Sequence, residues 1–535
     1  MINSTGYGIN FLSFRGDQIQ DSSLTKAVVA GARDENPTSI NRRPITVTSQ
    51  ENLVYEKPKQ LSLTTFSNED KVSSITRQLA KQAESHLPDN RFRGGAVRLS
   101  ELVAGSEKSY EQDIRQYSRY ENRAQKGESP KIDLSGYVDS STKDGNSFTL
   151  QLKTKDGDVI DFSINSYSGT GQGDDGRISA FSGLTVSYNL EGDLSKEEQA
   201  QVAVFTQNLE HLANDYFSNE DVDLSGLDLA SFSSFSNVEL TLDGSVESPS
   251  QQVFKLSFED TQSQRSIEVE SNGHKSNISV DKTSLDLMTS TSQGENGLQA
   301  YLEVLDKSAS ESRAEGSATS LMKDTFELGF SGLLEIEEDD DKPIIISNEL
   351  NKNIVGLPDF DFSFDSRVDN PNKEERPREY QGFSVELSLK SYFEKSDSKD
   401  KSSLIQTQKY ELEAAYYSPV GMMEKPDFDD QTYKYTQLDR SSEKTTRIDT
   451  EKGQIISAMT KESGEDNSTT LEYHKGKLVD EDVDGSSFVE VKDFTELAKQ
   501  ETDKQSRELL DTVMIDPYQT NSDSANINMV NLTSR

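Results

Sequence analysis

The chain has 535 residues, no cysteine, and 95 acidic against 56 basic residues, which gives a formal net charge of −39 at pH 7. The absence of cysteine excludes disulfides, thiolate metal sites and cysteine nucleophiles. The negative charge repels nucleic acid phosphates and anionic lipids, so we expect no nucleic acid and no membrane surface as a nonspecific partner.

Length and hydrophobicity narrow the class of protein further. A chain this long is typical of two or three domains. Hydrophobic residues make up only 32%, so we expect disordered segments or sheets with one face in water. Residues 1–10 contain neither a basic nor an apolar region, and no later window approaches the ~18 apolar residues of a membrane span. We therefore expect a protein that is cytoplasmic, or exported without a cleaved signal peptide.

The first part of the chain is predicted to contain little regular structure. Residues 1–66 show no sustained period and are expected to form a long disordered N-terminal region. Residues 67–130 are predicted to be a helical and polar linker. Ser67–Asp70 can cap a short amphipathic helix that ends near His86, and a second, weak helix is expected around Ser109–Arg123.

Residues 131–285 are predicted to be a β-rich α+β domain. Apolar and polar residues alternate on both sides of Lys155–Asp158, which indicates a β-hairpin with a type I′ Asp-Gly turn. Asn272-Gly273 indicates another hairpin of this kind. Because the alternate residues are polar, one face of this antiparallel sheet should meet water.

A helix is predicted over residues 195–218 within this domain. Ser195 and Glu198 have the spacing of a capping box, in which each side chain binds the other residue's backbone N–H. Five apolar residues follow at intervals of three and four: Val202, Phe205, Leu209, Leu212 and Tyr216. Their single stripe should pack on the dry face of the sheet.

The C-terminal half is predicted to repeat this organisation. Residues 290–345 should form a helical connector and an acidic loop, and residues 355–515 a second β-rich domain with a meander of short strands and a C-terminal helix. Residues 516–535 are expected to be a disordered tail. The predicted fold class is α+β, with amphipathic helices packed on antiparallel sheets that expose one face.

No motif in the sequence identifies an enzyme. A P-loop, a nucleophile elbow and a kinase motif set are absent, and the four histidines lack metal-ligand spacing. Gly171–Gly176 matches G-x-G-x-x-G, but a strand pattern follows where a dinucleotide fold needs a helix. A carboxylate pair that catalyses hydrolysis cannot be recognised from sequence spacing, so a hydrolase stays open as an alternative to a protein without enzymatic activity.

One acidic stretch could bind a metal ion. Asp480, Asp482 and Asp484 stand at alternate positions before Gly485, as in the first half of a calcium loop, and Glu490 could add a further carboxylate. The second half of the motif fails, because its twelfth position is a valine. These four acidic residues are the predicted calcium site, and a plain acidic turn between a strand and a helix is the competing interpretation.

The helix region carries one resemblance. The run Asn208–Ser218, after a strand that ends at Leu190–Leu194, resembles a segment of uncharacterised proteins of marine gammaproteobacteria. The likeness is limited to residues 184–218. It implies a bacterial origin and a recurrent strand-then-helix unit, and it brings no activity with it.

Because the sequence contains no catalytic motif, it favours a non-enzymatic interaction or structural protein. It would bind a protein partner that the sequence does not name, through exposed sheet surfaces and acidic loops. A carboxylate-dependent hydrolase and a calcium-stabilised extracellular protein are the alternatives.

Overall fold

The computed structural model describes residues 59–518, and everything below refers to this range. Excepted are residues 69–73, 84–94, 106–107, 122–130, 219–221, 223, 225–226, 228–234, 245–252, 288–290, 336–353, 369–371, 373–375, 396–400 and 500–505. The described residues belong to one compact unit that begins at Pro58.

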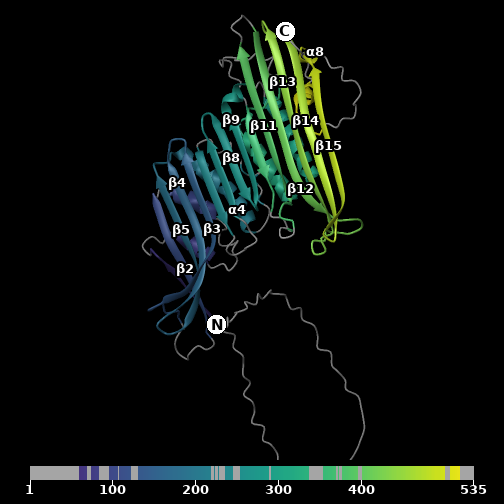
Figure 1. Cartoon of the computed structure of the whole chain (residues 1–535). Helices are drawn as coiled ribbons and strands as arrows, with labels where there is room; N and C mark the ends of the chain where they lie inside the picture. Colours follow the sequence, from purple (N-terminus) through teal and green to yellow (C-terminus); the bar gives the residue numbers. More distant parts are fainter. Residues whose placement is uncertain are drawn as a thin grey trace, which may run out of the picture. The chain divides into compact units, whose positions relative to one another are not determined.

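Within these ranges, fifteen strands form one antiparallel sheet (Figure 1). In space the order is β1-β2-β5-β4-β3-β6, and from β7 to β15 the strands follow one another as in the sequence. Their bounds are β1 (Lys59–Phe66), β2 (Ser109–Glu121), β3 (Val138–Thr154), β4 (Val159–Gln172), β5 (Ile178–Glu191), β6 (Phe235–Asp243), β7 (Phe254–Asp260), β8 (Gln264–Ser271), β9 (His274–Asp281), β10 (Phe360–Asp365), β11 (Gly382–Lys395), β12 (Lys401–Ser418), β13 (Tyr433–Glu451), β14 (Gln454–His474) and β15 (Lys477–Asp493).

Helices interrupt this series of strands at four places. They are α1 (Ser74–Ala83) and α3 (Gly95–Ala104) before β2, α4 (Lys196–Phe217) between β5 and β6, the 3-10 helix η3 (Lys282–Leu287) with α5 (Thr291–Glu311) and α6 (Gly316–Phe330) between β9 and β10, and α8 (Thr495–Ala498) and α9 (Ser506–Val513) after β15.

The two faces of the sheet differ because apolar and polar residues alternate along the strands. The register sets Ile267 of β8 beside Ile278 of β9, and Ile278 beside Phe362 of β10, and all three are buried. We call this side the covered face. The neighbouring row on the other side, which includes Glu268 and Asn277, is exposed and belongs to what we call the open face. The prediction of a sheet with one face in water is confirmed for these strands.

Helix α4 confirms the predicted helix of residues 195–218. Ser195 Oγ accepts from the backbone N–H of Glu198 at 3.2 Å, and Glu198 Oε2 accepts from the backbone N–H of Ser195 at 2.8 Å. The five apolar residues predicted to form its stripe are all buried in the main hydrophobic core.

Helices α5 and α6 pack on the covered face near β9 and β10. The ring of Phe326 on α6 contacts the rings of Phe360 and Phe362, with centroids 5.3 and 5.1 Å apart. Gly329 lies so close to β9 that a Cβ atom there would stand 2.6 Å from Cδ1 of Ile278. The glycine is therefore needed for this close approach.

The turns confirm one hairpin prediction and correct another. Asn272 and Gly273 both have positive φ, 52° and 81°, as a type I′ turn requires. In the predicted Lys155–Asp158 turn the hairpin is present, but only Gly157 has a positive φ. The type I′ assignment of that turn is therefore wrong. Two Lys-Gly turns, Lys452-Gly453 and Lys475-Gly476, have positive φ at both residues and join the long strands β13, β14 and β15.

The weak helix predicted around Ser109–Arg123 is wrong, because Ser109–Glu121 is strand β2. Tyr110, Gln112 and Ile114 are buried on the covered face. Gln112 is polar but occupies one of these buried positions, so the alternation of apolar and polar residues is hidden in the sequence. The prediction of short strands near the C-terminus is also wrong, because β13, β14 and β15 are 17 to 21 residues long.

Two regions expected to be disordered contain ordered residues. In the first, residues 1–66, Lys59–Phe66 is strand β1, and residues 1–58 lie outside the described part. The tail predicted from residue 516 is ordered through Tyr518, and residues 519–535 lie outside the described part. The acidic loop expected in 290–345 lies mostly outside it as well.

The two predicted β-rich regions contribute strands to the same sheet. β9, from the 131–285 region, pairs with β10, from the 355–515 region, with Phe360 opposite Val280 and Phe364 opposite Ser276. Helices α5 and α6 connect these two neighbouring strands in the sequence. An antiparallel ladder thus runs without interruption from one region into the other.

The segment Val513–Tyr518, here called the C-terminal strap, lies against covered-face side chains of β12 to β14. Gln408 donates to the carbonyl of Val513 at 2.7 Å and accepts from the N–H of Ile515 at 3.0 Å. Lys444 donates to the carbonyl of Met514 at 2.6 Å. Buried polar side chains of the sheet therefore satisfy the backbone of the strap.

We expect Ser195→Ala to lower the free energy of unfolding by about 1 kcal/mol, since it removes one side of the capping box. Urea denaturation followed by circular dichroism measures this loss. Gln207→Ala, at an exposed position of the same helix, is the control and should change stability by less than about 0.5 kcal/mol. Equal effects of the two substitutions would contradict a specific role of the cap.

Candidate interaction surface

The four residues predicted to bind calcium all lie on the edge strand β15. The acidic turn predicted for Asp480–Gly485 is wrong, because these residues pair with β14 in regular register, Asp480 opposite Glu472 and Gly485 opposite Asn467. Acidic residues and glycine suggested a turn, but the same stretch has the period of two that a strand needs. The strand continues to Asp493.

This strand keeps the predicted ligands apart. Asp480, Asp482, Asp484 and Glu490 project from the same side, and successive alternate residues of a strand are about 6.6 Å apart. Calcium needs several oxygens at about 2.3–2.6 Å. Nowhere in the described ranges do three or more His, Asp or Glu side chains gather closely enough to hold a metal ion. Calcium binding stays a prediction, and the conformation of β15 gives it no support.

The carboxylates of β15 differ from those of β14 in their partners. Cross-strand ion pairs on the covered side join β13 to β14: Lys434–Glu472 at 3.0 Å, Arg440–Asp466 at 2.7 Å and Lys444–Glu462 at 3.1 Å. Glu490 is paired with Lys492 on its own strand at 3.0 Å. Asp480, Asp482 and Asp484 form no ion pair with any residue that the structure describes.

β15 is exposed on both sides. Its open-face side carries Val483, Val489 and Val491, which keep 66%, 59% and 57% of their surface exposed. Of the described strands it has one neighbour, β14, because it is last in their order. At 17 residues it is about twice as long as β1, the strand at the opposite edge, where Leu61 is buried.

The open face is polar and carries charges of both signs. One register row crosses five strands through Ser388, Lys409, Glu443, Ser463 and Val489. Lys409 and Glu443 form an exposed ion pair at 3.4 Å. The sheet thus presents a broad, hydrated surface that is built on rigid strands.

A tyrosine cluster interrupts the open face at one end of β12 to β14. The hydroxyls of Tyr417 and Tyr433 both donate to Glu379 Oε2, at 3.0 and 3.1 Å. The guanidinium of Arg376 lies 4.3 Å from the ring centroid of Tyr473. Burial raises the pKa of Glu379, although the two phenol hydrogen bonds act in the opposite direction.

A polar cavity of about 610 Å³ lies beside β2 and β5 and includes Glu111 and Asp113 in its lining. These carboxylates are two positions apart on the same side of β2, which places their Cα atoms about 6.6 Å apart. Asp113 accepts from Arg115 at 3.2 Å and from the hydroxyl of Tyr167. One of the two carboxylates is therefore already bound to side chains of the same sheet.

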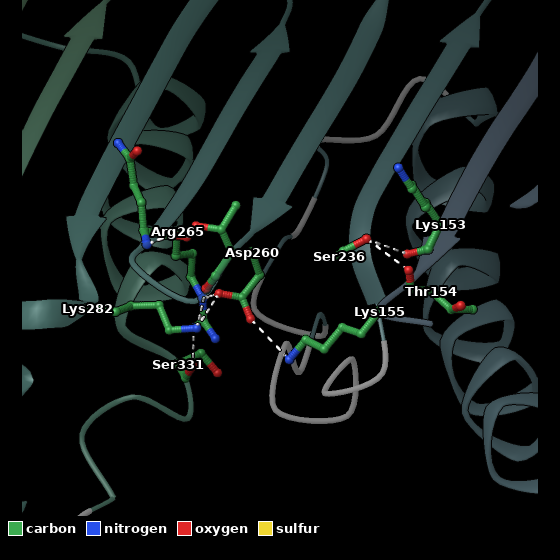
Figure 2. Close-up of polar contacts among 10 residues, drawn as sticks. Lys153, Thr154, Lys155, Ser236, Asp260, Arg265, Lys282 and Ser331 are labelled. Carbon is green, nitrogen blue, oxygen red and sulfur yellow. Dashed lines mark hydrogen bonds and ion pairs between the residues drawn. The ribbon is translucent and has the colours of Figure 1, made fainter. Parts of the chain in front are cut away.

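A cluster of opposite charges surrounds the buried Asp260 at the end of β7 (Figure 2). Lys282 Nζ lies 2.9 Å from Asp260 Oδ1, Arg265 Nε 3.7 Å from the same oxygen, and Lys155 Nζ 3.5 Å from Oδ2. Arg265 also donates to the carbonyl of Ser331 at 2.6 Å. Desolvation by burial lowers the pKa of Arg265, against the attraction of Asp260.

The Asp260 cluster joins elements that are far apart in the sequence. Its residues come from the β3–β4 turn, β7, β8 and η3, and Ser331 follows α6. Figure 2 shows the three cationic side chains directed toward the one carboxylate. These contacts hold strand ends and a helix end together, so we interpret the cluster as structural.

Sequence reasoning missed both clusters. Asp260 could have been recognised in the sequence. It is a charged residue at the next alternate position after Phe254, Leu256 and Phe258, where a buried residue is expected. Glu379 had none, because it lies in an irregular segment and meets its tyrosine partners only through the fold. The valines of β15 were overlooked together with the strand itself.

No protein-family model, curated protein or solved structure matches the chain. The resemblance of residues 184–218 to marine gammaproteobacterial proteins therefore stays a prediction. None of the helices in the described ranges combines the length and apolarity needed to cross a bilayer.

We expect Asp260→Asn to lower the free energy of unfolding by about 3–5 kcal/mol, because it leaves Arg265 and Lys282 enclosed without their anion. The control is Asp361→Asn, which breaks the exposed Lys390–Asp361 pair at 2.6 Å and should cost less than about 1 kcal/mol. Urea denaturation of both variants measures the difference. A loss no larger for Asp260 than for Asp361 would contradict the structural role of the cluster.

We expect Glu379 to make stability depend on pH. Because its pKa is raised in the folded protein, its contribution is fully present below the unfolded pKa and is lost as the pH rises through the folded pKa. Glu379→Gln stays neutral throughout. The free energy of unfolding of the wild type minus that of the variant should therefore fall as the pH rises above about 4.5, the ordinary pKa of a glutamate.

Denaturation curves at several pH values measure this difference. Glu411→Gln, at an exposed position of β12, reports the effect of removing a surface carboxylate and is the control. A difference for Glu379 that rises with pH would contradict the direction of the shift.

Proposed function

We propose that the chain is a non-enzymatic bacterial interaction or structural protein that binds a protein partner through the exposed surfaces of its sheet. The observation that carries this proposal is the open face, which is polar between its two aromatic clusters around Tyr117 and Tyr433 and carries none of the packed helices described above. Small-molecule sites are concave and mostly apolar. A broad polar surface with charges of both signs suits a macromolecule better.

The division of the sheet into two different faces supports the same proposal. Helices α4, α5 and α6 occupy the covered face, so the stabilising core and the interaction surface lie on opposite sides of the strands. Substitutions that alter the open face can therefore change a partner without disturbing the core. This separation is typical of binding proteins built on a rigid scaffold.

A carboxylate-dependent hydrolase is the second candidate. Glu111 and Asp113 in the cavity beside β2 are the observation that favours it, because paired carboxylates at a separation of about 5–9 Å can act as acid and base. Asp113 is already bound by Arg115 and Tyr167, so its carboxylate is not free to bind a water molecule or a substrate. We therefore place this function second.

The net charge of −39 supports a partner that is not nucleic acid. As part of this proposal, the protein works in the cytoplasm or, after export, outside the cell. A bacterial origin follows only from the resemblance of residues 184–218.

Site-specific photo-crosslinking in the native host tests the proposal. A crosslinking amino acid at Glu268 or Glu411 on the open face should give adducts with one defined partner, because both side chains are exposed there. The control is His211, which is exposed on α4 and should not give this adduct. The same adduct from His211, or none from the open face, would contradict the proposal.

A further inference from the structure

We infer that β15 is a docking edge for an extended, basic segment of a partner protein, which adds to the sheet as a sixteenth strand. This inference rests on the proposed function and names the class of partner. The docked segment would alternate basic residues with apolar residues.

The backbone of β15 leaves one edge open. Among the strands that the structure describes, only β14 pairs with β15, so along the other side of its 17 residues every second residue directs its N–H and C=O groups away from the sheet. Natural sheets usually shorten or cover such edges. β1 follows this rule with eight residues, whereas β15 does not.

The side chains of β15 alternate in a pattern that an added strand can match. Asp480, Asp482 and Asp484 project on the covered side of β15, and Val483 and Val489 on the open side. A strand added to this edge has the same period of two. Its basic residues would face the carboxylates on one side while its apolar residues cover the exposed valines on the other.

The charges of β15 favour a basic partner. On the covered side, three cations of β13 each pair with a carboxylate of β14, while the three aspartates of β15 lack cationic partners among the described residues. A second copy of the chain fits poorly, because β15 carries six acidic residues against two lysines. Pairing two such strands sets like charges against one another, which is destabilising.

The spacing of the carboxylates along β15 does not suit a metal site. The carboxylates are spaced along the strand and do not converge, which suits a row of separate cations better than one ion. Lysine or arginine residues at alternate positions of a strand repeat at this same spacing. Backbone pairing would supply affinity, and the side-chain pattern would supply selectivity.

Fluorescence anisotropy with the full-length protein tests the inference. The probes are labelled peptides of about twelve residues, the length of a long strand: one alternates Lys and Val, one has the same composition in two blocks, and one alternates Glu and Val. We expect the alternating Lys-Val peptide to bind at least about tenfold more tightly than the other two. Equal binding of the two lysine peptides would overturn the inference.

The site is tested with matched charge reversals. The triple variant Asp480→Lys, Asp482→Lys, Asp484→Lys should weaken the Lys-Val peptide at least about tenfold and favour the Glu-Val peptide. The control variant Glu295→Lys, Glu303→Lys, Glu311→Lys makes the same change of charge at exposed positions of α5, away from both proposed binding surfaces. An equal loss in both variants would show nonspecific attraction and overturn the inference.

Backbone pairing is tested with two N-methylated forms of the Lys-Val peptide, one methylated at odd and one at even positions. Only one set of N–H groups faces β15, so one form should lose binding and the other should keep it. Similar behaviour of both forms would overturn strand addition. If these tests fail while Glu268 and Glu411 still crosslink a partner, the proposed function stands without this edge. If the crosslinks also fail, the proposed function and the docking edge are both wrong.

Discussion

The apolar face of a sheet this wide has to be kept from water, and much of the remaining structure serves that constraint. Helix α4 covers it with one buried stripe, and α5 and α6 cover it with the aromatic contacts of Phe326. All of these elements pack on the same side because the register keeps apolar residues in phase from strand to strand. The open face follows from this arrangement, since its polar side chains need no cover.

The C-terminal strap solves the same problem with different chemistry. Under it the sheet carries Gln408 and the buried ion pair of Lys444 and Glu462. Enclosed charges are costly unless their remaining hydrogen bonds are made. The strap makes them, through the carbonyl of Met514 and the N–H of Asp516. Polar residues in the sheet and an irregular segment near the chain end therefore depend on each other.

The sequence was informative wherever a local pattern decided the structure. The capping box at Ser195, the Asn272-Gly273 turn and the alternation on both sides of Lys155–Asp158 each need only neighbouring residues, and each was predicted. β2 was missed because Gln112 occupies a buried position, and β15 because its carboxylates resemble a loop. The partners of Asp260 come from turns and helix ends along the chain, so no local pattern could bring Lys155 and Lys282 together. The joining of two β-rich regions through β9 and β10 is equally nonlocal.

An open edge is tolerable in this protein because of its charge. A long unpaired strand with exposed valines is a template for aggregation. On β15 the aspartates stand beside these valines, and each copy of the chain carries a net charge of −39. Repulsion between copies therefore blocks self-pairing without blocking the backbone groups themselves. The same carboxylates that protect the edge from other copies leave it accessible to a strand of opposite charge, so protection and selectivity come from one set of side chains.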